Sequence, residues 1–129
     1  MKYWKGSQTT HRLMYHLVWI PKYRKRILKG RLSERLKEIL IECADMNRWK
    51  IEEINIQLDH IHLLFQMRPE VSVSRMVQLF KGSSSRAIRE EFPQLREFLW
   101  GKNFWADGYF AETVGQLNET KIREYIKNQ

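Results

Sequence analysis

An alternating apolar stretch between residues 54 and 67 is the feature that most constrains the fold. Two apolar sets lie on either side of Asp59: Ile54, Ile56 and Leu58 before it, and Ile61, Leu63, Phe65 and Met67 after it. Successive side chains of a strand point to opposite faces of a sheet, so residues two apart line the same face. The stretch therefore predicts two neighbouring strands, which are antiparallel if the turn near Asp59 is tight.

Before these strands the sequence predicts one further strand and one helix. The segment from Thr10 to Ile20 mixes aromatic and β-branched residues in a nearly alternating pattern, and Pro21 ends it. Ser33 belongs to the residue types that cap helices, and apolar residues recur every three or four positions after it. These residues are Leu36, Ile39, Leu40, Cys43 and Met46. The spacing predicts a helix that starts at Ser33 and buries this side.

A second helix is predicted after the paired strands. Pro69 closes the preceding strand, and either Ser72 or Ser74 starts the helix. The helix must stop by Phe92, because Pro93 disfavours helical dihedral angles in the residue before it. Its buried side is predicted to hold Val73, Met76, Val77, Phe80, Ala87 and Ile88, and its opposite side carries Arg75, Arg86 and Arg89.

The last part of the chain predicts a fourth strand and a third helix. Asp107 and Gly108 form a turn signal between aromatic residues, and the alternating segment from Tyr109 to Val114 follows. Asn118 is expected to cap a final helix that runs to Gln129. The apolar side of this helix holds Ile122 and Ile126.

The order of strand, helix, strand, strand, helix, strand and final helix predicts an α+β fold. It matches the ferredoxin-like split β-α-β pattern, an antiparallel sheet with helices on one face, with a C-terminal helix added. A chain of 129 residues with 43% apolar content fits one domain that spans residues 1–129. Many nucleic-acid-binding proteins share this pattern, so the activity must be argued from the site.

The sequence also indicates a compartment. The apolar stretches are far shorter than the roughly 18 residues of a membrane span, and the first ten residues do not resemble a secretory signal. We therefore expect a cytoplasmic protein that does not enter a membrane. Cys43 is the single cysteine, so it cannot form an internal disulfide, and its helical position predicts a small buried apolar residue.

The net charge of +8 lies almost entirely near the N-terminus, since residues 1–33 hold nine Lys or Arg and no acidic residue. Its densest part consists of Lys22, Arg24, Lys25, Arg26, Lys29 and Arg31, with Tyr23 among them. Such a segment can neutralise phosphates and stack an aromatic ring on a base. Nucleic acid is the expected partner, and a solvated basic loop or a contact to acidic lipid are the alternatives.

His60 and His62 are candidates for a metal site. They are two residues apart on a predicted strand, so both side chains leave the same face and their rings are close enough to share one ion. The neighbouring apolar residues are expected to pack on the other face. The alternative is a pair of polar residues on a sheet surface, because a His-x-His pair is a weak motif by itself.

Tyr125 is a candidate nucleophile on the final helix. Lys121 and Gln129 lie one helical turn before and after it, which places all three side chains on one side. A phenol with a reference pKa near 10 reacts poorly at neutral pH unless a cation or an electrophilic phosphate is close. The alternative is an amphipathic tyrosine that packs beside Ile122 and Ile126.

Five segments of the chain, in their order along the sequence, resemble the single-tyrosine HUH transposases, often called TnpA, of the insertion-sequence 200/605 family. The name HUH denotes two histidines around a bulky hydrophobic residue, which here is DHIHLLF. The other four segments are HLVWIPKYR, LFKGSSSRAI, WADGYFAETVG and the terminal IREYIKNQ, which has the YIxxQ spacing of the family. The resemblance covers nearly the whole chain.

The resemblance implies an enzyme and a set of site residues. His60, His62 and Gln129 would hold Mg²⁺ or Mn²⁺, and Tyr125 on the last helix would form a 5′-phosphotyrosine link during metal-dependent cleavage and rejoining of single-stranded DNA. The DNA would carry a hairpin, and no nucleotide cofactor is needed because the reaction is a transesterification. A homodimer is also implied, in which Tyr125 of one subunit completes the histidine site of the other.

Three other interpretations stay open from the residues alone. A ferredoxin-like module could bind single-stranded RNA or DNA without catalysis, through stacked aromatics and the basic segment. A domesticated relative of the transposases could act on repeated chromosomal hairpins with the same site. A zinc hydrolase is the third, although the sequence holds no cysteine cluster and no HExxH motif.

Overall fold

The computed structural model describes residues 4–5, 10–11, 13–67, 70–97, 103–115 and 118–129. In chain order, its elements are β1 (Trp4–Lys5), β2 (Thr10–His11), β3 (Leu13–Trp19), η1 (Lys22–Arg24), α1 (Gly30–Met46), β4 (Lys50–Ile56), β5 (Ile61–Met67), α2 (Val73–Glu91), η2 (Pro93–Glu97), β6 (Phe110–Thr113) and α3 (Glu119–Lys127). The predicted strand end at Pro69 and residue 12, within the first predicted strand, lie outside the described residues.

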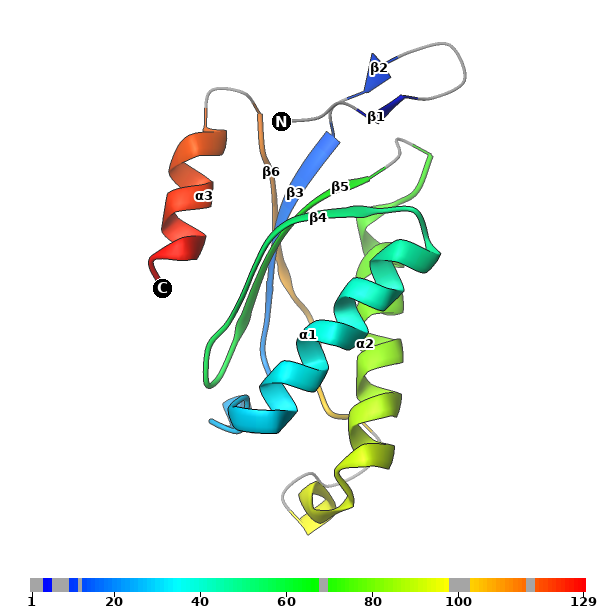
Figure 1. Ribbon diagram of the computed structural model, residues 1–129, viewed down its shortest axis with the longest axis vertical. Coiled ribbons are helices and arrows are strands. Elements are labelled where there is room, and N and C mark those ends of the chain that lie inside the picture. The colour runs from blue at the N-terminus through cyan, green and yellow to red at the C-terminus, as the bar shows by residue number, and fades with distance from the viewer. Residues whose placement is uncertain (1–3, 6–9, 12, 68–69, 98–102, 116–117) are drawn as a thin grey trace.

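The main sheet has the strand order β4-β5-β3-β6, and every neighbouring pair is antiparallel. Strands β3 and β4 therefore run in the same direction with β5 between them, and β5 and β6 do so with β3 between them. This is the split β-α-β arrangement, and the predicted fold class is confirmed. The short strands β1 and β2 form a separate pair (Figure 1).

Helices α1 and α2 cover one face of the sheet and enclose most of the apolar core (Figure 1). The ring of Phe80 on α2 lies at its centre, with ring centroids of Phe65, Trp49 and Trp19 at 5.6, 5.2 and 6.2 Å. The predicted apolar positions Ile61, Leu63, Phe65 and Met67 all point to this face and are buried. The alternation read from the sequence therefore identifies the helix-covered face.

Helix α1 begins earlier than predicted. It starts at Gly30, with Lys29 at the cap position and no side-chain cap, whereas the sequence predicted a start at Ser33. The reason is that Leu32 is buried beneath the sheet, and helical geometry one turn before Leu36 is what places it there. Met46 is 85% exposed, so its predicted burial was wrong, because α1 ends at this residue beyond its last core contacts.

Helix α2 has the predicted limits. Ser72 is its N-cap and accepts a hydrogen bond of 3.1 Å from the backbone N–H of Arg75. The helix ends at Glu91, and Phe92 before Pro93 leaves helical geometry. Met76, Val77, Phe80 and Ile88 are fully buried, while Val73 and Ala87 are partly buried against the same core.

Helix α3 covers the other face of the sheet (Figure 1), where the apolar cluster is small. Its buried members are Met14, Leu64, Val114 and Ile126. Asn118 occupies the predicted cap position, but its Oδ1 accepts from the backbone N–H of Gly115 at 2.8 Å and makes no cap hydrogen bond. The helix ends at Lys127, so the predicted extension to Gln129 was wrong by two residues.

The described residues contain no helix that is long and apolar enough to cross a membrane. Cys43 is a free thiol on the buried side of α1, as its spacing predicted. Burial raises the pKa of this thiol, which keeps it protonated.

Candidate active site

The two histidines of the DHIHLLF segment lie on the sheet face that α3 covers. His62 is in β5 and His60 directly precedes this strand. Their ring centroids are 4.9 Å apart and the ring planes are nearly perpendicular, at 84°. The alternation thus brings both imidazoles to the α3 side of the sheet, opposite the core under α1 and α2.

His62 is almost completely buried, with 4% of its surface exposed. Its Nδ1 lies 3.0 Å from Nε2 of His16, and its Nε2 has no hydrogen-bond partner among the described residues. Burial first, and then the charges of His16 and His60, lower the pKa of His62 to about 4, and the nearby Gln129 side chain acts in the opposite direction. His62 is therefore neutral at neutral pH, with one ring nitrogen available as a ligand.

His16 and Glu112 belong to the same site, although the sequence did not single them out. Nδ1 of His16 lies 2.8 Å from Oε2 of Glu112, and the two residues face each other across β3 and β6. His16 is 3% exposed. The signal that could have found it is its position in the first predicted strand, where it shares a face with Met14 and Val18, and the segment HLVWIPKYR begins with it.

His60 is held by a different group. Its Nδ1 lies 2.7 Å from Oδ1 of Asp59, and Oδ2 of Asp59 accepts a 3.1 Å hydrogen bond from Nε of Arg24. The hydrogen bond from His60, followed by that from Arg24, lowers the pKa of the Asp59 carboxyl. One residue of the predicted DNA-binding segment is thus joined to the histidine pair through a carboxylate.

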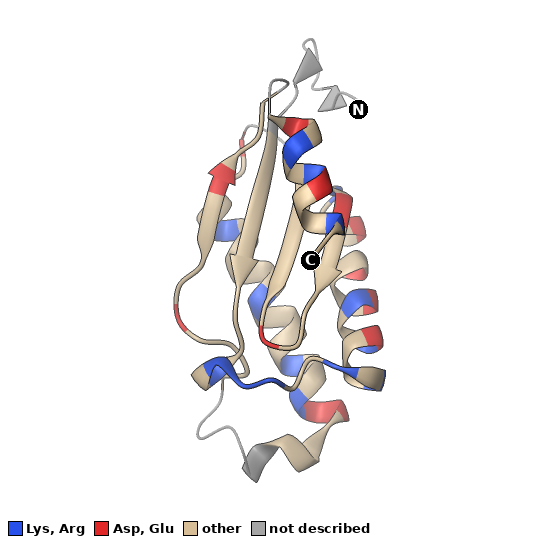
Figure 2. Cartoon of the chain, turned by 90° about the vertical axis from the view of Figure 1, so that its left-hand side faces the viewer, with Lys and Arg blue, Asp and Glu red and all other residues tan. Residues whose placement is uncertain are grey.

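The basic segment after β3 turns sharply at the edge of this site. Tyr23 and Arg24 have positive φ angles of 61° and 50°, a region that is strained for residues other than glycine. Tyr23 is 59% exposed, and the ammonium group of Lys22 lies 5.6 Å from its ring centroid. Figure 2 shows Lys and Arg gathered along this segment, with Arg26 exposed and Lys25 half-buried.

Tyr125 projects from α3 toward the histidines. Its ring centroid lies 5.4 Å from that of His62, with perpendicular planes, and 6.3 Å from that of His16. The side chain is nevertheless 54% exposed. Its phenol is thus beside the imidazoles and also accessible to a large substrate.

Lys121 lies on the same helix as Tyr125, and Gln129 lies just after the end of this helix. Nε2 of Gln129 donates a 3.1 Å hydrogen bond to the backbone carbonyl of Tyr125, so the amide oxygen is the remaining donor atom for an ion. Lys121 is exposed one turn before Tyr125. The described residues hold no cluster of three His, Cys, Asp or Glu suited to a metal.

Helix α3 is attached to its own sheet mainly by polar contacts. The side-chain amide of Asn55 donates a 2.7 Å hydrogen bond to the carbonyl of Ile126. Arg123 forms ion pairs with Glu53 at 3.2 Å and with Glu52 at 3.6 Å, both on β4, and Lys127 pairs with Glu53 at 3.4 Å. These contacts place Tyr125 over the histidines of the same chain.

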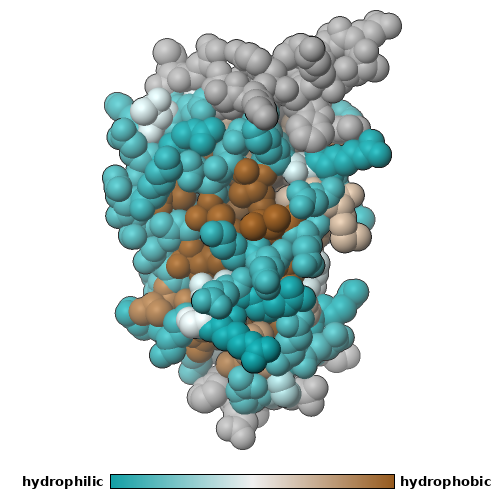
Figure 3. Space-filling view, viewed as in Figure 1, coloured by the Kyte–Doolittle hydropathy of each residue, from teal (hydrophilic) through white to brown (hydrophobic). Residues whose placement is uncertain are grey.

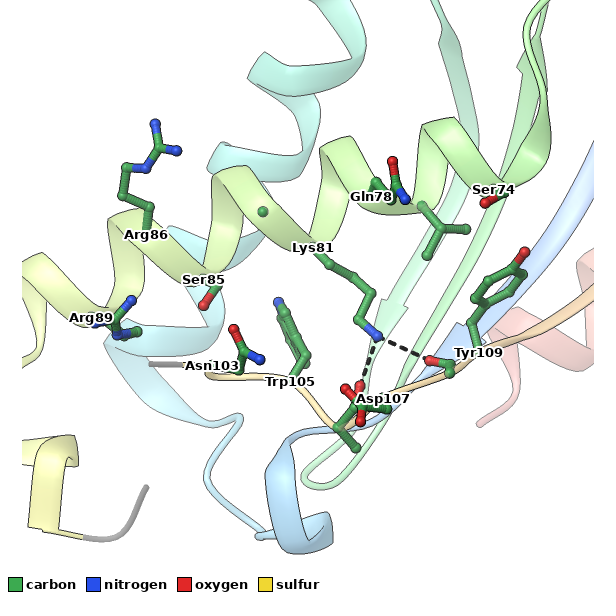
Figure 4. Close-up of a pocket in the computed structure, with 14 residues that line it drawn as sticks. Ser74, Gln78, Lys81, Ser85, Arg86, Arg89, Asn103, Trp105, Asp107 and Tyr109 are labelled. Carbon is green, nitrogen blue, oxygen red and sulfur yellow. Dashed lines mark hydrogen bonds between the residues drawn. The ribbon is translucent and has the colours of Figure 1, made fainter. Parts of the chain in front are cut away.

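A separate groove of about 600 Å³ lies between α2 and the segment that precedes β6 (Figure 4). Lys81 spans it and donates hydrogen bonds to the carbonyls of Ala106 at 2.7 Å and Gly108 at 3.0 Å. Burial lowers the pKa of this lysine. The two hydrogen bonds of its ammonium group hold the turn that leads into β6. Arg86 and Arg89 also line the groove.

Comparison with known proteins identifies the family. The family model described as "Transposase IS200 like" matches residues 9–129. The chain belongs to this family. The ISDra2 transposase TnpA of Deinococcus radiodurans is 36% identical over 125 residues, which cover 97% of this chain and 89% of that protein. The transposase of insertion sequence element IS200 from Salmonella typhimurium is 35% identical over 95% of this chain and 80% of its own length.

Two solved structures resemble this chain. The crystal structure of a proposed transposase from Deinococcus radiodurans has a TM-score of 0.80 and 34% identity, and covers 100% of this chain and 98% of that one. The structure of a REP-associated tyrosine transposase bound to a REP hairpin has a TM-score of 0.67 over 98% of this chain and 70% of that one. At 13% identity, this second likeness concerns the fold alone.

Proposed function

We propose that this IS200-like transposase cleaves and rejoins single-stranded DNA with Tyr125 as the nucleophile. The observation that carries the proposal is the approach of the exposed Tyr125 ring to within 5.4 Å of His62, whose buried Nε2 has no hydrogen-bond partner among the described residues. A buried ring nitrogen without a partner is costly unless another group binds it. A nucleophile next to such a nitrogen is the arrangement expected of a metal-assisted phosphoryl-transfer site.

The proposed reaction is a transesterification. The Tyr125 oxygen attacks the phosphorus of a DNA phosphodiester, a 5′-phosphotyrosine bond forms, the bond to the 3′ oxygen breaks, and the strand leaves with a 3′-hydroxyl. The reverse attack by a 3′-hydroxyl, from the same or another strand, releases Tyr125 and restores a phosphodiester. The phosphotyrosine conserves the bond energy, so the cycle needs no ATP.

The donor atoms present fit a divalent ion. Nε2 of His60, Nε2 of His62 and the amide oxygen of Gln129 are the groups that would hold it. The amide oxygen is a ligand type that suits Mg²⁺ or Mn²⁺, and imidazole nitrogens are common ligands of divalent transition metals. When bound, such an ion would polarise a phosphate oxygen and favour in-line attack. The chain's own part is to keep His62 neutral and to hold both imidazoles and Tyr125 on the same side of the sheet.

The expected substrate is single-stranded DNA that carries a hairpin. The basic segment of Lys22, Tyr23, Arg24, Lys25 and Arg26 supports this, because Arg24 contacts Asp59, which in turn contacts His60. Lys121, exposed near Tyr125, extends the cationic surface along α3. The REP-associated transposase of similar fold was solved with a REP hairpin. A domesticated transposase acting on repeated chromosomal hairpins would use the same site and differ only in target.

A covalent-adduct assay tests the proposal. The protein is incubated with single-stranded oligonucleotides from the flanks of its own gene, with Mg²⁺ or Mn²⁺, and the products are separated under denaturing conditions. We expect a protein–DNA adduct that is lost in Tyr125→Phe, in the double variant His60→Ala with His62→Ala, and in EDTA. Tyr109→Phe, another exposed tyrosine, is the matched control that retains it. An adduct that survives Tyr125→Phe overturns the assignment of the nucleophile, and DNA binding without any adduct favours the non-catalytic module.

We also propose a homodimer in which Tyr125 of one subunit completes the histidine site of the other. Strand β4 supports a second copy, because it is an edge strand with half-exposed isoleucines at 51, 54 and 56. Figure 3 shows apolar side chains along this edge, beside α1. An unpaired edge can add a strand from another chain.

A mixing experiment separates the two positions of the nucleophile. Tyr125→Phe protein is mixed with protein that carries His60→Ala and His62→Ala, neither of which should cleave alone. Recovery of cleavage, once subunit exchange has been verified by mass, supports a shared site. Absence of recovery in verified mixed dimers supports the position of α3 on its own sheet.

A further inference from the structure

Glu112, His16 and His62 form one hydrogen-bonded line across three strands. The carboxylate of Glu112 lies 2.8 Å from Nδ1 of His16, and Nε2 of His16 lies 3.0 Å from Nδ1 of His62. The two imidazole rings are nearly parallel, at 15°. The line begins at the half-exposed Glu112 on β6 and ends at the buried Nε2 of His62.

The proton positions along this line follow from its chemistry. A carboxylate only accepts, so Nδ1 of His16 carries a proton and donates it to Glu112. In a neutral His16, Nε2 is then an acceptor, and Nδ1 of His62 must donate to it. His62 is neutral in turn when its Nδ1 carries the proton and the lone pair is on Nε2. When both histidines are neutral, the Glu112 carboxylate therefore determines the tautomer of His62 through His16.

We propose that Glu112 and His16 are positioning residues that hold His62 in the Nδ1–H tautomer, so that its Nε2 lone pair faces the metal. This inference rests on the proposed function of His62 as a ligand. Hydrogen bonds to the second ring nitrogen of a ligating histidine fix its tautomer and its orientation. Here the outer group is a histidine that a carboxylate orients, and both act through His62 without touching the ion.

His60 supports the same interpretation by an independent contact. Its Nδ1 lies 2.7 Å from the Asp59 carboxylate, which again requires an Nδ1–H and leaves Nε2 as the acceptor. Both histidines thus have Nδ1 engaged by a neighbouring group, and Nε2 of His62 has no hydrogen-bond partner among the described residues. A sheet surface that needed only to satisfy two polar side chains would have no reason to engage the same nitrogen of each.

The first test measures protonation in the metal-free protein. Long-range ¹H–¹⁵N NMR spectra report which ring nitrogen of each histidine carries the proton. We expect His62 as the Nδ1–H tautomer in the wild type and a mixture of tautomers in Glu112→Ala and His16→Phe. His16→Gln is the conservative variant, since its amide can donate to Glu112 and accept from His62, and it should retain the wild-type tautomer.

The second test measures binding of Mn²⁺ alone, by electron paramagnetic resonance of the free ion. We expect Glu112→Ala and His16→Phe to weaken affinity roughly 10- to 100-fold, the usual effect of losing an outer-shell partner. Thr113→Ala, on the same edge strand but the opposite face, is the matched control and should bind as the wild type does. Glu112 is half-exposed, so its variant keeps the test decisive if His16→Phe does not fold.

Two results would overturn the proposal. One is a wild-type His62 that carries its proton on Nε2, and the other is Mn²⁺ affinity within roughly twofold of wild type in folded Glu112→Ala. Failure of the proposed cleavage reaction gives a different pattern. The wild type would then form no DNA adduct, while the His62 tautomer and the Mn²⁺ affinity would still depend on Glu112 and His16. The two hypotheses are thus tested separately.

Discussion

The two faces of the four-stranded sheet bury different kinds of side chain. Under α1 and α2, aromatic and aliphatic residues from both helices and from the sheet pack around Phe80. Under α3, the fully buried apolar residues among those described are only Met14, Leu64, Val114 and Ile126, and the rest of that face carries imidazoles, carboxylates and amides. One face holds most of the apolar core, and the other holds the proposed site. Variants should therefore affect stability and activity according to the face that they occupy.

The largest effect on stability is expected at the centre of the core between the sheet and helices α1 and α2. Phe80→Ala removes a ring that contacts Phe65, Trp49 and Trp19, and should lower the free energy of unfolding by about 3–5 kcal/mol. Denaturant titration measures it. An effect below about 1 kcal/mol would show that this face does not dominate folding.

A smaller and more local effect is expected under α3. Ile126→Ala should cost about 2 kcal/mol or less, because α3 can detach while the remaining core stays intact. Hydrogen exchange is the measurement: amides of α3 should exchange faster, while those of β5 keep their wild-type rates. Equal acceleration in both elements would mean that the two faces unfold as one unit.

The basic segment should affect binding and leave stability unchanged. Neutralising Arg24 and Arg26 together should weaken hairpin DNA binding, and each lost phosphate contact should reduce the log–log salt slope by about 0.7–0.9. Lys37→Gln combined with Arg75→Gln is a control of equal charge, because both side chains are exposed and lie outside the basic segment. Binding measured over a salt series gives the slope, and an unreduced slope in the arginine variant would place the DNA backbone elsewhere.

The smallest effect is a gain of stability on the helix-covered side. Arg48 follows the C-terminus of α1 with a φ of 59°, where glycine is the preferred residue. Arg48→Gly should therefore raise the free energy of unfolding by up to about 1 kcal/mol, with no change in cleavage. Thermal unfolding monitored by circular dichroism detects this, and a lower melting temperature would contradict it.

The sequence predicted β5 and α2 well, because both depend on local patterns, whereas the strand expected from Ile54 to Leu58 runs from Lys50 to Ile56. Alternation identified the buried face of β5, and Ser72 and Pro93 set the ends of α2. It predicted less well where tertiary packing decides. The burial of Leu32 moves the start of α1 to Gly30, and no short-range signal marks that contact.

The candidate site divides in the same way. His60, His62 and Tyr125 are found from spacing and from the family's motifs, and the structure brings their rings together. Glu112 and His16 are 96 residues apart in the chain, and only strand register makes them neighbours. A sequence read by itself gives the face of each strand but not the partner across it.

The attachment of α3 has a consequence for assembly. Its contacts, the Asn55 amide and the pairs of Arg123 and Lys127 with Glu53, are made to groups that a second copy of the sheet displays identically. The helix can therefore exchange between two equivalent docking surfaces at almost no cost in contact energy. Which surface it occupies is decided by effective concentration, that is, by the length and direction of the connecting segment and the distance between the sheets. Dimerisation through another surface would be enough to redirect the nucleophile without any change in the bonds that hold it.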